Sequence, residues 1–164
     1  MFCWVNMTIR KALLASGLLI CFALNAQKVN AVYKIDELRQ RINKSDSTLV
    51  VNFWATWCKP CIQELPAFDS LALANPKLNV LLVCLDFREE IDNKVNPFLQ
   101  KKNIKSECVL LDEVNGNDFV NKISPKWSGA IPATLFKKRK TEKLVEKKMR
   151  LEEMQEFVSQ INKQ

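Results

Sequence analysis

Residues 51–65 of the chain read VNFWATWCKPCIQEL. The first part is an apolar run typical of a buried strand, and the second part is predicted to be a helix. Cys58 and Cys61 lie at the junction, and Pro60 falls in the first turn of the helix, where proline is tolerated. Cys58 is thereby placed at the helix N-terminus, where free backbone N–H groups and the helix dipole stabilise a thiolate. The pattern predicts thiol–disulfide exchange, in which one thiolate attacks a disulfide and the second cysteine releases the product.

The composition fits one globular domain with a real core. The chain has 164 residues, of which 48% are hydrophobic and 26% charged. Its formal net charge is +7, but the lysines are scattered and indicate a solvated surface. There is no histidine, which excludes Ser-His-Asp and Cys-His catalysis and zinc sites that need imidazole.

Residues 1–26 have the features of a secretory signal peptide. Arg10 and Lys11 give a basic start, residues 12–24 are apolar but short for a membrane span, and Ala26 offers a small residue before the cut. Translation from Met7 would keep these features. We therefore expect one domain over residues 27–164, exported to the periplasm or cell envelope, where disulfides persist. The alternative is an uncleaved segment that anchors the protein in the membrane.

The order of predicted elements indicates an α/β fold. Strands and helices alternate early, and a hairpin comes late, so the sheet is expected to be parallel in the middle and antiparallel at one edge. The predicted helices span residues 31–43, 59–75, 97–102, 118–123 and 151–161, with Asn96 as the N-cap of the third. The predicted strands span residues 49–54, 80–87, 107–111, 134–138 and 143–149.

Three motifs carry a resemblance to a known family. NFWATWCKPC ends at Cys61, Glu64-Leu-Pro follows it, and Ile131-Pro132 comes much later. Together they resemble the thioredoxin superfamily, and within it the exported TlpA/ResA-like thiol–disulfide oxidoreductases. The resemblance covers the chain from about Tyr33 onward. It implies a thioredoxin-like fold with a central mixed sheet flanked by helices, and a helix–strand–helix insertion after the second core strand.

The resemblance also implies roles for particular residues. Cys58 matches the exposed nucleophile of the family and Cys61 the buried resolving cysteine. Pro132 matches a proline that is cis in this fold and packs beside the pair. The backbone of Ile131 is then free to pair with an extended substrate segment. Ala133 stands where many relatives have threonine, a difference expected at the substrate contact.

Glu64 is the predicted proton carrier. It follows Cys61 by three residues, so the two side chains point to similar faces of the helix. Burial would raise the pKa of this carboxyl and let it exchange a proton with Cys61, a role that the resemblance also assigns to it. The alternative is an exposed helix glutamate. Asn52 occupies the position of the buried aspartate of cytoplasmic thioredoxin.

Trp57 and Lys59 flank the nucleophile. Trp57 is expected to cover the cysteine pair and to contact the substrate, with plain packing as the alternative. The positive charge of Lys59 is expected to lower the pKa of Cys58, unless the side chain is simply solvated.

The remaining cysteines, Cys84 and Cys108, lie in predicted strands and are interpreted as buried small apolar residues. A structural disulfide between them is the alternative, and a zinc site is disfavoured by their spacing. The basic run at residues 137–140 is interpreted as a solvated turn, so no nucleic-acid partner is expected. No metal is expected, nor any cofactor beyond the Cys58–Cys61 disulfide itself.

The predicted function is that of an exported thiol–disulfide oxidoreductase, acting as a monomeric disulfide reductase. Its substrates would be disulfide-containing envelope proteins, and the resemblance implies apocytochrome c in cytochrome c maturation among them. A membrane electron donor would reduce it again. The alternatives are a disulfide oxidase or isomerase, and a non-enzymatic binding module in which the two cysteines form a structural disulfide.

Overall fold

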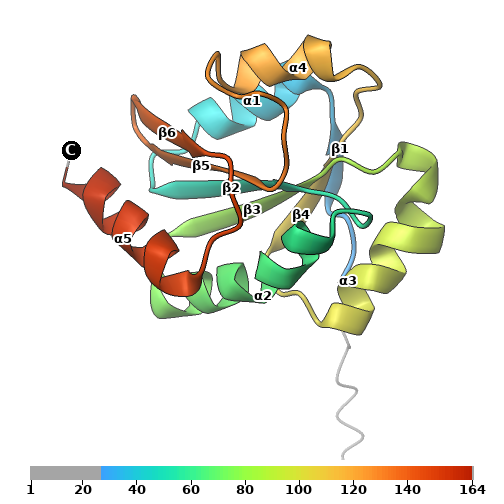
Figure 1. Ribbon diagram of the computed structural model, residues 1–164, viewed down its shortest axis with the longest axis horizontal. Coiled ribbons are helices and arrows are strands. Elements are labelled where there is room, and N and C mark those ends of the chain that lie inside the picture. Colours follow the sequence, from blue (N-terminus) through green and yellow to red (C-terminus); the bar gives the residue numbers. More distant parts are fainter. Residues whose placement is uncertain (1–26, 164) are drawn as a thin grey trace, which may run out of the picture.

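The computed structural model describes residues 27–163, so the predicted signal peptide lies outside the described residues. The chain forms a six-stranded sheet covered by helices on both faces (Figure 1). The strands are β1 (Ala31–Tyr33), β2 (Leu49–Trp54), β3 (Asn79–Cys84), β4 (Glu107–Leu111), β5 (Ala133–Lys138) and β6 (Thr141–Val145). The helices are α1 (Ile35–Asn43), α2 (Lys59–Ala74), α3 (Asn96–Lys102), α4 (Gly116–Ile123) and α5 (Leu151–Asn162). Within residues 27–163, no helix combines the length and the apolar character needed to cross a membrane.

The sheet is mixed, as the sequence predicts. Its strand order is β1-β4-β3-β2-β5-β6. The first four strands of this order are parallel, whereas β5 runs antiparallel to β2 and β6 antiparallel to β5. Between β3 and β5 the chain passes through α3, β4 and α4, and β4 joins the sheet between β1 and β3. β2 is therefore an inner strand, and its C-terminal end leads directly to the cysteines.

Two hydrophobic cores lie on the two faces of the sheet. α1 and α4 cover one face, and α2 and α5 cover the other (Figure 1). β2 serves both cores, because successive side chains point to opposite faces. Val50 and Trp54 face α2, while Val51 and Phe53 face α1. Burial on both faces explains why this strand is a nearly continuous apolar run.

The prediction of a helix over residues 31–43 is wrong for its first four residues, because α1 begins at Ile35. Ala31–Tyr33 is strand β1, which pairs in parallel with Val109–Leu111 of β4. The helical periodicity rests on Ile35, Leu38 and Ile42, all of which lie in α1. Sequence periodicity could not distinguish the preceding three residues, because their state depends on a partner strand far along the chain.

Asn96 does not cap a helix, contrary to prediction. A short 3₁₀ turn (Arg88–Glu90) and a π-helical turn (Ile91–Val95) run into α3, so Asn96 lies within a continuous helical region. Its side chain instead accepts a hydrogen bond from the Val29 N–H at 2.8 Å. The side chain thereby ties the helical region to the segment before β1.

The second strand of the hairpin is also displaced from its prediction. β6 covers Thr141–Val145 rather than residues 143–149. Residues 146–149 leave the sheet, and the backbone N–H of Met149 reaches the side chain of Glu64 on α2. This departure from regular strand structure completes the environment of Glu64.

Substitution of Leu82, which is 0% exposed, tests how much the core between β3 and α2 contributes to stability. We expect Leu82→Ala to lower the free energy of unfolding by about 2–5 kcal/mol, through lost burial and a residual cavity. Leu73→Ala is the matched control, because Leu73 is 85% exposed and its truncation should cost less than about 0.5 kcal/mol. Urea unfolding of the two oxidised variants measures both values, and equal effects would contradict this view of the core.

Candidate active site

Cys58 and Cys61 form a disulfide at the N-terminus of α2. Their Cα atoms are 5.3 Å apart, Cys58 is the N-cap residue and Pro60 lies in the first turn. The Cys61 N–H points at Cys58 Sγ at 3.4 Å, so the helix terminus does face this sulfur. Cys58 is 6% exposed and Cys61 0%. Only the predicted nucleophile therefore reaches the surface, and it does so through a small area.

The Ile131-Pro132 segment lies beside the disulfide. The bond between these residues is cis, as predicted, and the carbonyl oxygen of Ile131 is 3.8 Å from Cys58 Sγ. Ile131 is partly exposed, whereas Pro132 and Ala133 are buried. The structure thus brings residues more than 70 positions apart in sequence to the same sulfur.

Glu64 is buried, which rules out the alternative of an exposed helix glutamate. It is 1% exposed and lies one turn after Cys61 on the buried face of α2. Its Oε1 accepts a hydrogen bond from Asn52 Nδ2 at 2.9 Å, and its Oε2 accepts one from the Met149 N–H at 2.8 Å. Burial raises the pKa of Glu64 to about 7, although the two hydrogen bonds and the charge of Lys148 act to lower it. A carboxyl with this pKa can take up and release a proton near neutral pH.

Asn52 links Glu64 to the strand that follows Pro132. Besides Glu64, its Nδ2 lies 3.1 Å from Thr134 Oγ1 and 3.4 Å from the Ala133 carbonyl oxygen. Its Oδ1 has no hydrogen-bond partner. With both carboxylate oxygens receiving an N–H donor, the arrangement is complementary to ionised Glu64 and offsets part of the cost of its burial.

Trp57 stands at the surface next to the nucleophile. Its side chain is 65% exposed, so the packing alternative is wrong. Lys59 is also exposed. Trp54, by contrast, is fully buried, and its ring centroid is 5.4 Å from that of Phe98, so it is a core residue.

The sequence did not predict two residues that hold the loops around the cysteine pair. The first is Asp86. This buried carboxylate accepts hydrogen bonds from the Thr56 N–H at 2.7 Å and from Thr56 Oγ1 at 2.5 Å. Burial acts to raise its pKa, but the hydrogen bonds from Thr56, Cys84 and Lys94 outweigh burial and lower it. Asp86 therefore fixes the loop that carries Trp57 and Cys58. The available signal was a charged aspartate within the otherwise apolar run predicted as a strand over residues 80–87.

The other missed residue is Trp127, which holds the loop before Pro132. Its indole N–H donates to the Ala130 carbonyl at 2.9 Å, and its ring packs on Phe53 at a centroid distance of 4.6 Å. Glu146 accepts a hydrogen bond from the Ser128 N–H at 3.1 Å, which supports the same loop. A lone tryptophan offers little sequence signal, because core packing explains it equally well.

Cys84 and Cys108 are buried free cysteines, as interpreted from the sequence. Cys84 pairs in register with Leu110, and Leu82 with Cys108, so the cysteines are two residues out of register. Strand spacing and rise then separate their Cα atoms by about 8 Å, beyond the ~7 Å that a disulfide can bridge. Burial raises the pKa of Cys108 to about 12 and also raises that of Cys84. Neither thiol is therefore poised for exchange.

Residues 27–163 contain no cluster of potential metal ligands.

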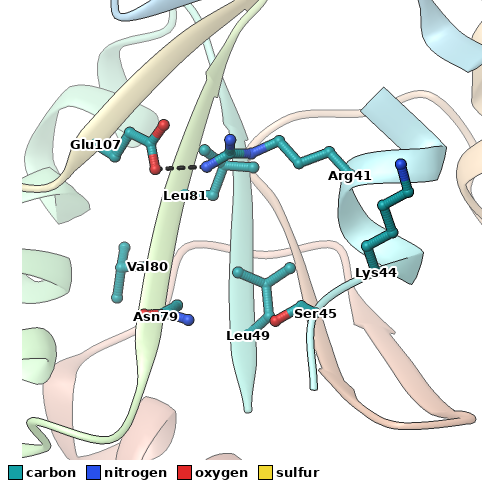
Figure 2. Close-up of a pocket in the computed structure, with 8 residues that line it drawn as sticks. All are labelled: Arg41, Lys44, Ser45, Leu49, Asn79, Val80, Leu81 and Glu107. Atoms are coloured by element: carbon teal, nitrogen blue, oxygen red, sulfur yellow. Dashed lines mark hydrogen bonds and ion pairs between the residues drawn. The ribbon is translucent and has the colours of Figure 1, made fainter. Parts of the chain in front are cut away.

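An open depression of about 440 Å³ lies at the other end of the sheet (Figure 2). It is lined by Leu49 at the start of β2, by the start of β3, by Glu107 and by the end of α1. Arg41 points across it to Glu107, with their side chains 2.5 Å apart (Figure 2). No cysteine of residues 27–163 lines the depression.

The basic run at residues 137–140 is less solvated than expected. Lys137 is 3% exposed, and its Nζ donates to the Arg139 carbonyl. Lys138 Nζ donates to the Asn162 carbonyl at 2.8 Å. Two of the four cationic groups are thus engaged in hydrogen bonds within the fold.

The fold and the cysteine pair resemble those of a known group of proteins. The thioredoxin family model matches residues 29–106, just under half of the chain, and the structure has a thioredoxin-like fold. This match and the relatives described next support a ResA/TlpA-like protein of the thioredoxin superfamily.

Curated relatives include two Bacillus thiol–disulfide oxidoreductases. Sporulation thiol-disulfide oxidoreductase A of Bacillus subtilis is 34% identical over 70 residues, which is 42% of each chain. Thiol-disulfide oxidoreductase ResA of Bacillus thuringiensis is 36% identical over 55 residues, which is 34% of this chain and 31% of the relative. The matched region thus spans less than half of either relative. These names and the Cys58–Cys61 disulfide support a redox function.

Solved structures share the fold over most of their length. A thioredoxin-related protein from Neisseria meningitidis serogroup B aligns with a TM-score of 0.63 at 20% identity, covering 73% of this chain and 88% of that one. StoA from Bacillus subtilis aligns with a TM-score of 0.55 at 22% identity, covering 71% and 85%. At these identities the likeness establishes the fold alone.

Glu64→Gln should remove a pH dependence of stability. The pKa of Glu64 is about 7 in the folded protein against 4.5 ordinarily, so the folded state holds this proton more tightly than the unfolded chain does. Its contribution to the free energy of unfolding therefore falls as the pH rises from about 4.5 to about 7, by about 3 kcal/mol in all. The glutamine amide can still accept from Met149, and a rotated Asn52 can offer its unpaired Oδ1.

The measurement is urea unfolding of the oxidised protein between pH 4.5 and 8. Relative to wild type, Glu64→Gln should gain stability as the pH rises to about 7, and the difference should level off above that. Glu152→Gln, on the exposed face of α5, is the control and should show no such trend. A constant difference between Glu64→Gln and wild type would contradict a raised pKa.

Proposed function

We propose that this protein is a thiol–disulfide oxidoreductase that reduces disulfides of exported proteins through the Cys58–Cys61 pair. The observation that carries the proposal is the placement of one slightly exposed sulfur at a helix N-terminus, 3.8 Å from the Ile131 carbonyl oxygen. A purely structural disulfide would require neither this exposure nor a buried carboxyl with a pKa of about 7 on the same helix.

The first step is attack by Cys58. In the reduced protein its thiolate is stabilised by the N–H groups and dipole of α2, with Lys59 nearby. The thiolate forms a bond to one sulfur of the client disulfide, and the other client sulfur leaves as a thiolate and takes a proton. The client backbone pairs with the chain at Ile131, which holds the target sulfur in line.

The second step releases the client. Ionised Glu64 accepts the proton of the Cys61 thiol, and the Cys61 thiolate then attacks Cys58 Sγ. The Cys58–Cys61 bond forms as the mixed disulfide breaks, and the second client sulfur leaves. Two electrons have passed from the cysteine pair to the client. The burial of Glu64 and its two N–H donors support this role.

Regeneration requires an external reductant. An exported protein has no access to cytoplasmic thiols, so we propose that a membrane electron donor returns two electrons to the pair. The clients are disulfide-containing proteins of the cell envelope, apocytochrome c among them. The protein acts as a monomer without a bound cofactor. The apolar N-terminal segment supports export, and the names of the Bacillus relatives support the reaction class.

Reductase activity is tested by insulin reduction with dithiothreitol and by equilibrium with glutathione. We expect wild type to accelerate insulin reduction, and Cys58→Ser to abolish the acceleration. The reduction potential should lie below about −200 mV, nearer to thioredoxin than to the strong oxidants at about −120 mV. A potential near that of the strong oxidants would establish an oxidase instead. If wild type did not reduce insulin, the alternative of a non-enzymatic binding module would be favoured.

The clients are identified by a separate experiment. The variant Cys61→Ser stalls the mixed disulfide, so clients from envelope extracts stay bound to Cys58.

The role of Glu64 is tested by the separate rates of the two steps. In a single turnover with a disulfide peptide, Glu64→Gln should form the mixed disulfide at the wild-type rate. Its decay should be at least about tenfold slower above pH 7, because the base that accepts the Cys61 proton is gone. Quenched-flow sampling measures both rates, with Glu152→Gln as the control. Equal decay rates in the variant and wild type would refute proton transfer through Glu64.

A further inference from the structure

Three exposed apolar side chains lie at the same edge of the sheet as the cysteine pair. In residues 27–163 four large apolar side chains are more than 60% exposed, namely Trp57, Leu73, Phe87 and Val114. Trp57, Phe87 and Val114 follow the C-terminal ends of β2, β3 and β4, which are parallel neighbours in the sheet. Chain segments that leave adjacent parallel strands emerge at one edge. These three residues are called the apolar row below.

Polar contacts tie the three segments of the apolar row together. Asp86 binds Thr56, so Phe87 and Trp57 are each one residue from a shared pair of hydrogen bonds. Arg88 forms an ion pair with Asp112 at 3.6 Å, which joins the segment of Phe87 to that of Val114. The order from the nucleophile outward is therefore Trp57, Phe87, Val114. The apolar groups are exposed although their backbone segments are fixed.

The size of the apolar row matches a short extended peptide. Neighbouring strands are about 4.8 Å apart, so the row spans roughly 10 Å from β2 to β4, the length of about three extended residues. It begins at Trp57, adjacent to Cys58, and so continues directly from the site where a client disulfide must lie. A small disulfide can occupy the site but cannot reach Phe87 or Val114.

We propose that the apolar row binds the apolar side chains of an extended client polypeptide next to its disulfide, so that Phe87 and Val114 favour protein disulfides over small ones. The proposal rests on the proposed function, since it concerns how clients are selected at the same cysteine pair. Exposed aromatic groups in a rigid setting suit this task, because they bury a large area at little cost in side-chain entropy.

The test compares two substrates of the reduced protein. Second-order rate constants are measured for insulin, a polypeptide probe, and for bis(2-hydroxyethyl) disulfide, a small polar probe. In the double variant Phe87→Ser, Val114→Ser, the ratio of the insulin rate to the small-disulfide rate should fall about tenfold. Each single variant should fall by less. Leu73→Ser is the matched control, because Leu73 is 85% exposed but lies near the far end of α2, and it should leave the ratio as in wild type.

The outcomes separate the two proposals. An unchanged ratio in the double variant, or an equal fall in Leu73→Ser, would overturn the apolar row as a client site while leaving the reductase intact. Equal slowing of both probes would show that the variant had damaged the cysteine pair itself, and would overturn the selection role. Failure of wild type to reduce either probe would overturn the proposed function, and the apolar row as a client site with it.

Discussion

The buried carboxyl of Glu64 is the constraint around which the site is assembled. A carboxylate deep in a core is costly unless N–H donors reach it, and here the donors come from two distant parts of the chain. Asn52 supplies one from the middle of β2, and Met149 supplies the other from the loop after β6. α2, the central strand and the C-terminal loop are therefore joined at one side chain. The two hydrogen bonds only partly offset burial, which leaves the pKa near 7, where proton exchange is useful.

The same network reaches the segment that we propose contacts the client. Asn52 Nδ2 also lies near the Ala133 carbonyl oxygen and Thr134 Oγ1, just after Pro132. On the other face of the sheet, Trp127 packs on Phe53 and holds the Ala130 carbonyl. The loop beside Cys58 is thus supported from both sides of β2. A single inner strand leads to Cys58 at its end and, through its side chains, positions both Glu64 and the loop before Pro132.

Local patterns in the sequence predicted what depends on local physics. The predictions of β2 and β4 as strands, of a proline in the first turn of α2 and of a C-terminal helix at α5 were all correct. The secondary structure was predicted wrongly where it depends on a segment that is distant in the sequence. Ala31–Tyr33 is a strand because β4 is beside it, and residues 146–149 leave the sheet and reach Glu64. For the same reason the motif was enough to predict that Cys58, Cys61 and Glu64 lie together, whereas Asp86 and Trp127 act through contacts that no spacing reveals.

The arrangement divides the site into a buried half and an exposed half with different physical demands. Proton transfer from Cys61 needs low water access and fixed donors, and that half is 0–1% exposed at Cys61 and Glu64. The client selection that we propose needs accessible apolar area, and Trp57 and Phe87 are each more than 60% exposed. Asp86 connects the two halves. Its buried carboxylate accepts hydrogen bonds from Thr56, which precedes Trp57 and Cys58 in the loop, and the next residue in the chain is the exposed Phe87. Because the loops are held by buried hydrogen bonds, the outer side chains can change with the client while the geometry at Cys58 stays the same. Variation of specificity within this fold is therefore expected at the exposed ends of β3 and β4 rather than at the cysteine pair.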